Sequence, residues 1–349
     1  MKGYPTINVI QTDTPFDTSI KREGLIVLVA AFKDSDYLVK PFNDIDDAIA
    51  QETGATGDVA IGLNMLNKIK SNGNNQVVLA NLNSGNDNYN LTLEKLTELF
   101  TELEDGRFEQ LLIPYELTSD MQVAYLEFFE AKFNKGNPIG LVSYLTASTR
   151  QAVIDYSQSL ISPNYYGALY AGITTQLSQG TSELTLGETS AIIGGLLSQL
   201  DLGISLTELN LPGYDGKVSK TELTENIVDA IVDNGLLGFR YKDSFNKLLS
   251  IINGNTPDNY DIRTIRIYHA FVNELIESLY AGIPNNEIKY ADFVAKFKNI
   301  EGNFLKRELI NSATYNVSKT GLVSCGIRTS VNENEVLINF DVKVNLEVE

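Results

Sequence analysis

Hydrophobic and polar positions in the first part of the chain follow two alternating patterns. Continuous apolar runs, such as residues 24–32 (GLIVLVAAF) and 76–82 (QVVLANL), are typical of strands buried on both faces. Between the runs, apolar residues such as Met65, Leu66 and Ile69 recur at helical spacing. The strands predicted here span residues 24–32, 76–82, 108–114 and 138–145. The predicted helices span residues 58–70, 91–103, 119–133 and 148–157.

This alternation predicts an α/β domain with a mostly parallel sheet over residues 22–160. The pattern then changes, and residues 161–330 are expected to form an α+β unit. Its predicted helices span residues 165–177, 190–200, 221–234, 262–280 and 291–311. Its predicted strands are a hairpin of 236–243 with 247–253, followed by 321–330.

The last segment, residues 331–349, holds the most regular pattern of the chain. Over residues 335–349 apolar and polar side chains alternate with a period of two, and only Leu337 departs from it. The apolar positions are Val336, Ile338, Phe340, Val342, Val344, Leu346 and Val348. Such a strand either completes the sheet of its own chain or adds to the sheet of a neighbouring chain through main-chain hydrogen bonds.

The first 21 residues predict an arm on a linker. Residues 4–10 alternate as a short extended arm, with Tyr4, Ile7 and Val9 as its larger apolar side chains. Residues 11–21 are mostly polar, and they could reach roughly 35 Å when extended. The arm therefore need not fold back on its own domain.

Composition narrows the classes of function. The formal net charge is −18, so the chain repels nucleic-acid backbones and anionic membrane surfaces. The longest apolar run, residues 25–32, is too short to span a bilayer, and the first residues do not predict a signal peptide. The single cysteine, Cys325, cannot form an internal disulfide. We expect neither nucleic acid nor membrane insertion to be part of the function.

Residue patterns for catalysis or metal binding are scarce. The single histidine, His269, lies inside the predicted helix 262–280, where a packed structural role is favoured. Residues 215–222 resemble half of a calcium loop, but Leu211 and Gly213 stand where its first acidic ligands would be. The sequence therefore predicts no catalytic residue, no metal site and no cofactor. An α/β enzyme with an unrecognised site stays as an alternative.

Several short segments, in their order along the chain, resemble one family. They are residues 24–29, 191–196, 204–207, 211–213 and 261–266, with Asn303-Phe304-Leu305 and the last two strands. The family is the tail sheath proteins of contractile phage tails and of related bacteriocins or injection systems. Gly194-Gly195 departs from it, because the family usually has Ala-Gly there.

The resemblance implies a fold with an outer α/β N-terminal domain, an α+β C-terminal sheath domain and exchanged terminal β-strands. It implies a subunit that polymerises with itself as stacked rings or a helix around an inner tube. Contraction then drives the tube through a target cell envelope. Further implied partners are baseplate and tail terminator proteins. The implied location is a virion tail or a phage-tail-like particle, assembled in the host bacterial cytoplasm.

Carried over to this sequence, the exchange arms are residues 4–10 and the terminal strand, with residues 11–21 and 330–335 as hinges. Cations gather in the last two predicted helices, and they are candidates for a surface that faces an acidic tube. They are Arg263, Arg266, Lys296, Lys298, Lys306 and Arg307. Ordinary salt bridges with Glu274, Glu301 and Glu308 are the alternative for these cations. Another self-assembling tail component, a tube or baseplate protein, is the alternative function.

Overall fold

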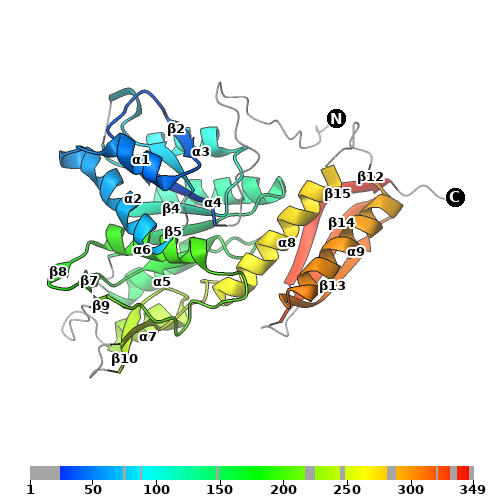
Figure 1. The fold of residues 1–349 in the computed structure, drawn as a ribbon. Helices are drawn as coiled ribbons and strands as arrows, with labels where there is room; N and C mark the ends of the chain where they lie inside the picture. The colour runs from blue at the N-terminus through cyan, green and yellow to red at the C-terminus, as the bar shows by residue number, and fades with distance from the viewer. Residues whose placement is uncertain are drawn as a thin grey trace.

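The structure is a computed structural model with a large α/β part and a smaller C-terminal sheet (Figure 1). It describes residues 24–73, 76–86, 89–146, 149–216, 225–243, 248–280, 288–319, 321–330 and 336–345. The arm at residues 4–10, the linker 11–21, Leu346 and Val348 lie outside these ranges.

A six-stranded sheet with the order β2-β3-β1-β4-β5-β6 forms the centre of the α/β part. Its strands are β1 (Ile26–Ala30), β2 (Val39–Phe42), β3 (Val77–Asn81), β4 (Gln110–Glu116), β5 (Gly140–Tyr144) and β6 (Leu169–Ile173). All neighbouring strands run parallel except β2, which is antiparallel to β3. Every residue of β1 and β3 is buried, as their continuous apolar runs predict.

Helices cover both faces of this sheet, because alternate residues of its strands enter two separate cores. Ile26 and Leu28 pack with one core, and Val27 and Val29 pack with the other. On the first face lie α1 (Ile45–Glu52), α2 (Ala60–Asn72) and α6 (Leu186–Gln199). On the second lie α3 (Leu93–Leu103), α4 (Ser119–Asn134), α5 (Arg150–Ser159) and α7 (Glu225–Asp233). Two 3-10 turns span Gly57–Val59 and Ser84–Asn86.

The helix predicted over residues 165–177 is wrong. Residues Leu169–Ile173 form β6, which pairs with β5 and is buried throughout. Gly140 leaves the space that β6 needs, since a Cβ there would lie 2.2 Å from the ring of Tyr170. The sheet thus extends past residue 160, while the domain boundaries given above stay predictions.

A four-stranded sheet with the order β12-β15-β14-β13 forms the C-terminal part. Its strands are β12 (Ile288–Lys289), β13 (Ile310–Val317), β14 (Leu322–Thr329) and β15 (Val336–Asn345). The helix predicted over 291–311 is shorter, because α9 (Tyr290–Lys306) ends before Glu308, whose φ of 57° breaks the helical path into β13. Smaller elements are β7 (Leu177–Gln179), β8 (Ser182–Glu183) and β9 (Asp215–Gly216), and the predicted hairpin is β10 (Phe239–Asp243) with β11 (Leu248–Ile251).

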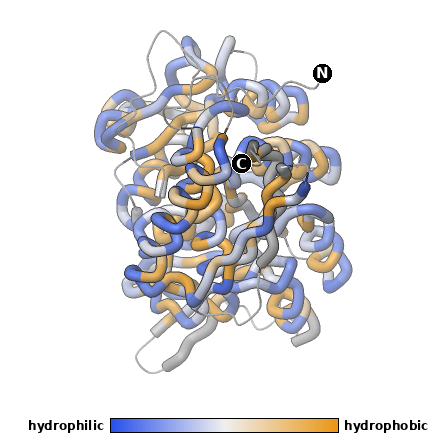
Figure 2. The backbone as a smooth tube through the Cα atoms, turned by 90° about the vertical axis from the view of Figure 1, so that its right-hand side faces the viewer, coloured by the Kyte–Doolittle hydropathy of each residue, from blue (hydrophilic) through white to orange (hydrophobic). Residues whose placement is uncertain are grey.

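One long helix, α8 (Ile262–Tyr280), connects the two parts and has the predicted bounds. Its Tyr268 ring packs against Phe133 of α4, and its Phe271 ring packs edge-on against Phe297 and Phe304 of α9. Hydrophobic and hydrophilic positions alternate along the helices in Figure 2, as helices packed on one side require. Because a single core includes residues of the α/β part, α8 and the C-terminal sheet, the two parts are packed together.

Candidate assembly surface

The terminal strand β15 lies inside the sheet of its own chain. It runs antiparallel to β14 on one side and parallel to the short β12 on the other. Its apolar positions Val336, Ile338 and Phe340 stand opposite Ile327, Cys325 and Val323, which are all buried. This register sets alternate positions of β15 opposite buried residues of β14, which agrees with the period-two pattern of the strand.

Val342 lies where the register with β14 shifts, and Val344 is buried beside Ile288 of β12. The described chain thus shows the first of the two arrangements expected for this strand, pairing within one molecule. Exchange with a neighbouring chain stays a prediction. Among the described strands none lies beyond β13, so its eight residues form a free edge of this sheet.

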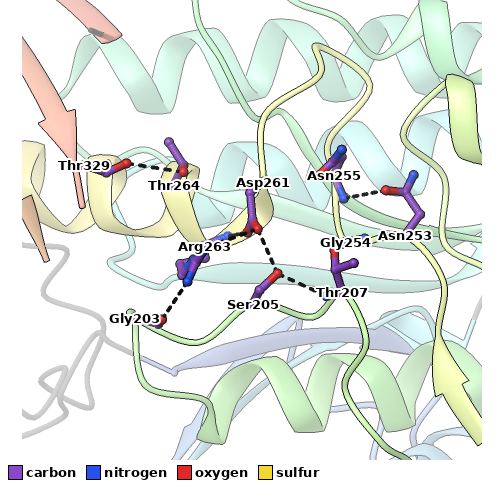
Figure 3. Close-up of polar contacts among 10 residues, drawn as sticks. All are labelled: Gly203, Ser205, Thr207, Asn253, Gly254, Asn255, Asp261, Arg263, Thr264 and Thr329. Carbon is purple, nitrogen blue, oxygen red and sulfur yellow. Dashed lines mark hydrogen bonds and ion pairs between the residues drawn. The ribbon is translucent and has the colours of Figure 1, made fainter. Parts of the chain in front are cut away.

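The beginning of α8 is held by the loops that carry the family resemblance (Figure 3). Asp261 caps the helix, because its Oδ1 accepts a hydrogen bond of 2.8 Å from the amide of Arg263. Its Oδ2 accepts a hydrogen bond of 2.8 Å from the hydroxyl of Ser205. Thr207 accepts a bond of 2.9 Å from the amide of Gly254. The segments 204–207 and 261–266, distant in sequence, are therefore in direct contact.

Two neighbours on α8 extend these contacts to other segments. Arg263 donates a hydrogen bond of 3.3 Å to the carbonyl of Gly203 and lies 3.6 Å from Asp261. The hydroxyl of Thr264 lies 3.4 Å from that of Thr329 at the end of β14, and both residues are buried. The N-terminal end of α8 is thus tied to the sheet that contains the terminal strand.

The structure places one of the six candidate cations in the interior. Arg266 is 3 % exposed, and its Nε donates a hydrogen bond of 2.5 Å to Oε1 of Glu109, which is 8 % exposed. A guanidinium at this depth cannot contact a second protein, so the prediction that Arg266 faces a tube is wrong for this residue. Sequence reasoning missed Glu109, since its partner lies 157 residues away.

The other cations differ in exposure. Lys296 is half-buried and donates to the carbonyls of Ser278 and Leu279 at the end of α8. Lys298, Lys306 and Arg307 are exposed on α9 and just after it. Lys298 is paired with Glu301, and Arg307 lies 3.9 Å from Glu274, so ordinary helix salt bridges account for part of this charge.

Charge is distributed unevenly between the two parts of the sequence. Residues 1–260 hold 17 Lys and Arg against 33 Asp and Glu, a net charge of −16. Residues 261–349 hold 10 against 12, a net charge of −2. The C-terminal part is therefore the one that an acidic partner would approach with least repulsion.

The single histidine and the single cysteine are both buried. His269 is 2 % exposed, and its ring nitrogens lie 2.7 Å from the hydroxyl of Tyr170 and 3.2 Å from the carbonyl of Tyr166. Burial raises the pKa of the Cys325 thiol, so that it stays protonated and poorly nucleophilic. Of the calcium-like loop, residues 217–222 lie outside the described ranges.

The carboxyl edge of the parallel sheet is where doubly wound folds bind ligands. Here α2 closes it beside β1, because a Cβ on Gly62 would lie 2.5 Å from the carbonyl of Ala31 and from the Phe32 ring. The side chain of Asn81 holds the loop that follows β1. Its oxygen accepts a hydrogen bond from the amide of Phe32, and its nitrogen donates one to the carbonyl of Asp34. Within the described ranges, no cluster of His, Cys, Asp and Glu could hold a metal ion, and no helix is long and apolar enough to cross a membrane.

No family model matches the chain, and neither does any curated protein. Solved structures do match it. A tail sheath protein from Desulfitobacterium hafniense is 10% identical with a TM-score of 0.66, over 98% of this chain and 99% of that chain. A tail sheath protein from Listeria innocua is 11% identical with a TM-score of 0.64, over 94% and 96%. A chain of the contracted helical sheath of the anti-feeding prophage is 12% identical with a TM-score of 0.54, over 93% and 90%.

Chains in the baseplate of the same prophage particle and in the contracted sheath of an extracellular contractile injection system (PVC) match as well. The agreement extends through the α/β part, α8 and the C-terminal sheet, since almost the full length of each chain is covered. The chain therefore has the fold of the tail sheath proteins, as the resemblance of its sequence motifs predicts.

Proposed function

We propose that the chain is the structural subunit of a contractile tail sheath, which polymerises around an inner tube and shortens to drive the tube through a target cell envelope. The observation that carries this proposal is the fold match over 98% of this chain and 99% of a tail sheath protein. The chain acts by assembly, not by catalysis. Its partners are other copies of itself, the inner tube, the baseplate and the tail terminator, in a tail-like particle assembled in the bacterial cytoplasm.

Electron microscopy of the purified full-length chain, with and without an inner tube from the same gene cluster, tests this proposal. We expect stacked rings or striated tubes whose length follows that of the added inner tube. Sedimentation at rising protein concentration provides the matching solution measurement. A chain that stays monomeric throughout, with or without the tube, would contradict the proposal.

A second candidate is a sheath-like subunit of a baseplate. It is favoured by the match to a chain in the baseplate structure of the anti-feeding prophage, which covers 99% of this chain. Such a subunit would stop at a single ring, whereas a sheath subunit continues to long polymers. The distribution of polymer lengths in the same micrographs separates the two functions.

Within this function, β15 exchanges with a neighbouring chain by taking the place beside β14 there that it has in its own chain. Residues 4–10 add to the free edge of β13 in a neighbouring copy. Disulfide trapping tests the exchange of β15. Ser324 and Asn339 are register partners on β14 and β15, so Ser324→Cys with Asn339→Cys can crosslink these strands. In assembled material, exchange gives ladders of linked chains on a denaturing gel. Either single cysteine variant is the control. If only crosslinks within single chains form, β15 stays paired with the β14 of its own chain.

The exposed cations Lys298, Lys306 and Arg307 are the proposed contacts to the inner tube, together with the partly buried Lys296 and Arg263. The near-neutral C-terminal part supports this choice, because the rest of the chain is strongly acidic. Lys298→Glu with Lys306→Glu should weaken tube binding in co-sedimentation and leave assembly without a tube unchanged. Lys70→Glu, an exposed lysine on α2, is the matched control. Unchanged tube binding would remove these residues from the contact.

A further inference from the structure

The buried carboxylate of Glu109 binds the backbone of Gly24, the first described residue. The amide of Gly24 donates a hydrogen bond of 2.5 Å to Oε2 of Glu109, the residue just before β4. The second oxygen of the same carboxylate accepts from Arg266 on α8, also at 2.5 Å. Glu109 therefore joins the start of the α/β part directly to the long helix.

The surroundings of this ion pair keep its groups in place. The amide of Glu109 donates to the carbonyl of Leu25 at 3.1 Å, and Nη1 of Arg266 donates to the carbonyl of Leu200 at the end of α6 at 3.0 Å. An apolar pair of similar volume is often as stable as a buried ion pair. Stability alone thus gives no reason for two charges here, whereas a fixed position for Gly24 does.

The same end of α8 also holds the C-terminal sheet. Thr264 lies two residues before Arg266 and contacts Thr329 of β14, the strand that pairs with β15. Two contacts therefore meet on one turn of α8. Arg266 is linked through Glu109 to Gly24, and Thr264 contacts Thr329 at the end of β14.

We propose that Glu109 and Arg266 are positioning residues for the N-terminal arm. They fix the position of Gly24, from which the arm and its linker continue in sequence, and they connect that position to α8. The inference rests on the proposed function, in which residues 4–10 bind a neighbouring copy.

The exchanged pair Glu109→Arg with Arg266→Glu separates positioning from simple charge pairing. It keeps two opposite charges but removes the carboxylate at position 109 that accepts from Gly24. We expect amide hydrogen exchange at Gly24 to become at least ~10-fold faster in this variant. The matched control is Asn81→Leu, which disrupts a buried polar network at the opposite end of the sheet and should leave exchange at Gly24 unchanged.

Glu109→Gln provides a second variant if the exchanged pair does not fold, since its amide oxygen still accepts one hydrogen bond. A smaller increase of exchange at Gly24 is expected for it. An unchanged rate at Gly24 in every variant that folds would overturn the anchoring role.

Assembly is the second measurement. At matched stability, polymers of the Glu109 variants should dissociate on dilution ~10-fold faster than those of Asn81→Leu. If the polymers dissociate at equal rates although amide hydrogen exchange at Gly24 is faster, the positioning role is wrong and the proposed sheath function is unaffected. A wild-type chain that forms no polymer counts instead against the proposed function.

Discussion

At the residue scale, Lys132 is a buried cation on α4 that completes the end of α3. Its ammonium donates to the carbonyls of Leu103, Glu104 and Gly106 and lies 4.7 Å from the centre of the Phe108 ring. Carbonyls at the end of a helix lack the amide of the next turn, and the lysine supplies a donor to them. The carbonyl of Leu103 also accepts from the amide of Gly106, and that of Gly106 also accepts from the side-chain amide of Asn137.

Lys132→Met should lower the free energy of unfolding by about 2 kcal/mol, because the carbonyl of Glu104 loses the lysine donor and two further carbonyls lose one of their two donors, while the volume is kept. Urea unfolding followed by circular dichroism measures the change. Lys306→Met, which removes an exposed lysine, should cost less than about 0.5 kcal/mol. Equal effects of the two substitutions would show that the buried contacts contribute little.

Buried phenols make the fold sensitive to alkali. Burial raises the pKa of Tyr115 to about 12, and it also raises the pKa values of Tyr37, Tyr125, Tyr156 and Tyr268 well above their usual value. Unfolded tyrosines ionise near pH 10. Their contribution to stability is therefore complete below about pH 10 and is lost as pH rises above it.

Urea midpoints at pH 8 and pH 10.5 should show this loss, at roughly 0.8 kcal/mol per buried tyrosine at the higher pH. Tyr156→Phe should remove one tyrosine's share of the difference. A midpoint that is the same at both pH values would mean that these phenols ionise in the folded chain.

At the element scale, α2 and α6 approach so closely that two adjacent glycines have different roles. A Cβ on Gly195 would lie 2.9 Å from the carbonyl oxygen of Ile69 on α2, which is backbone and cannot yield alone. A Cβ on Gly194 would lie 3.3 Å from the end of the Leu112 side chain, which can move. The resembling sheath proteins usually have Ala-Gly at these two positions. The glycine that replaces their alanine is thus Gly194, where a Cβ meets only a movable side chain.

Gly194→Ala should be neutral or stabilise the chain by up to about 1 kcal/mol, since alanine favours the helix. Gly195→Ala should destabilise it by about 2 kcal/mol or more, because α2 must shift. Thermal unfolding of the two variants side by side measures the difference. Stability changes of the same sign and size would contradict the helix contact described here.

The elements that sequence patterns predict well are those whose pattern is local. The apolar runs of β1 and β3, and the period of 3.6 in α8, depend only on nearby residues. No pattern within residues 169–173 shows that they form a strand, because the space that β6 occupies comes from Gly140 on the neighbouring strand. Likewise, no local signal shows that Arg266 meets Glu109 or that Ser205 meets Asp261.

At the scale of the whole molecule, charge opposes self-association. The first 260 residues carry a net charge of −16, so copies of the chain repel each other at low ionic strength. Raising NaCl from 0.05 M to 0.5 M shortens the Debye length from roughly 14 Å to 4 Å. The polymer fraction should therefore increase with salt, as measured by sedimentation. A decrease would instead indicate that attractive ion pairs between copies dominate.

The packing of α8 against both parts limits how such proteins can exchange pieces during evolution. One side of the helix belongs to the core of the six-stranded sheet, and the other completes the core beneath α9 and β14. A recombination breakpoint between the two parts would join surfaces that never adapted to each other. We therefore expect the C-terminal sheet to be inherited together with α8 and with the helices that α8 contacts.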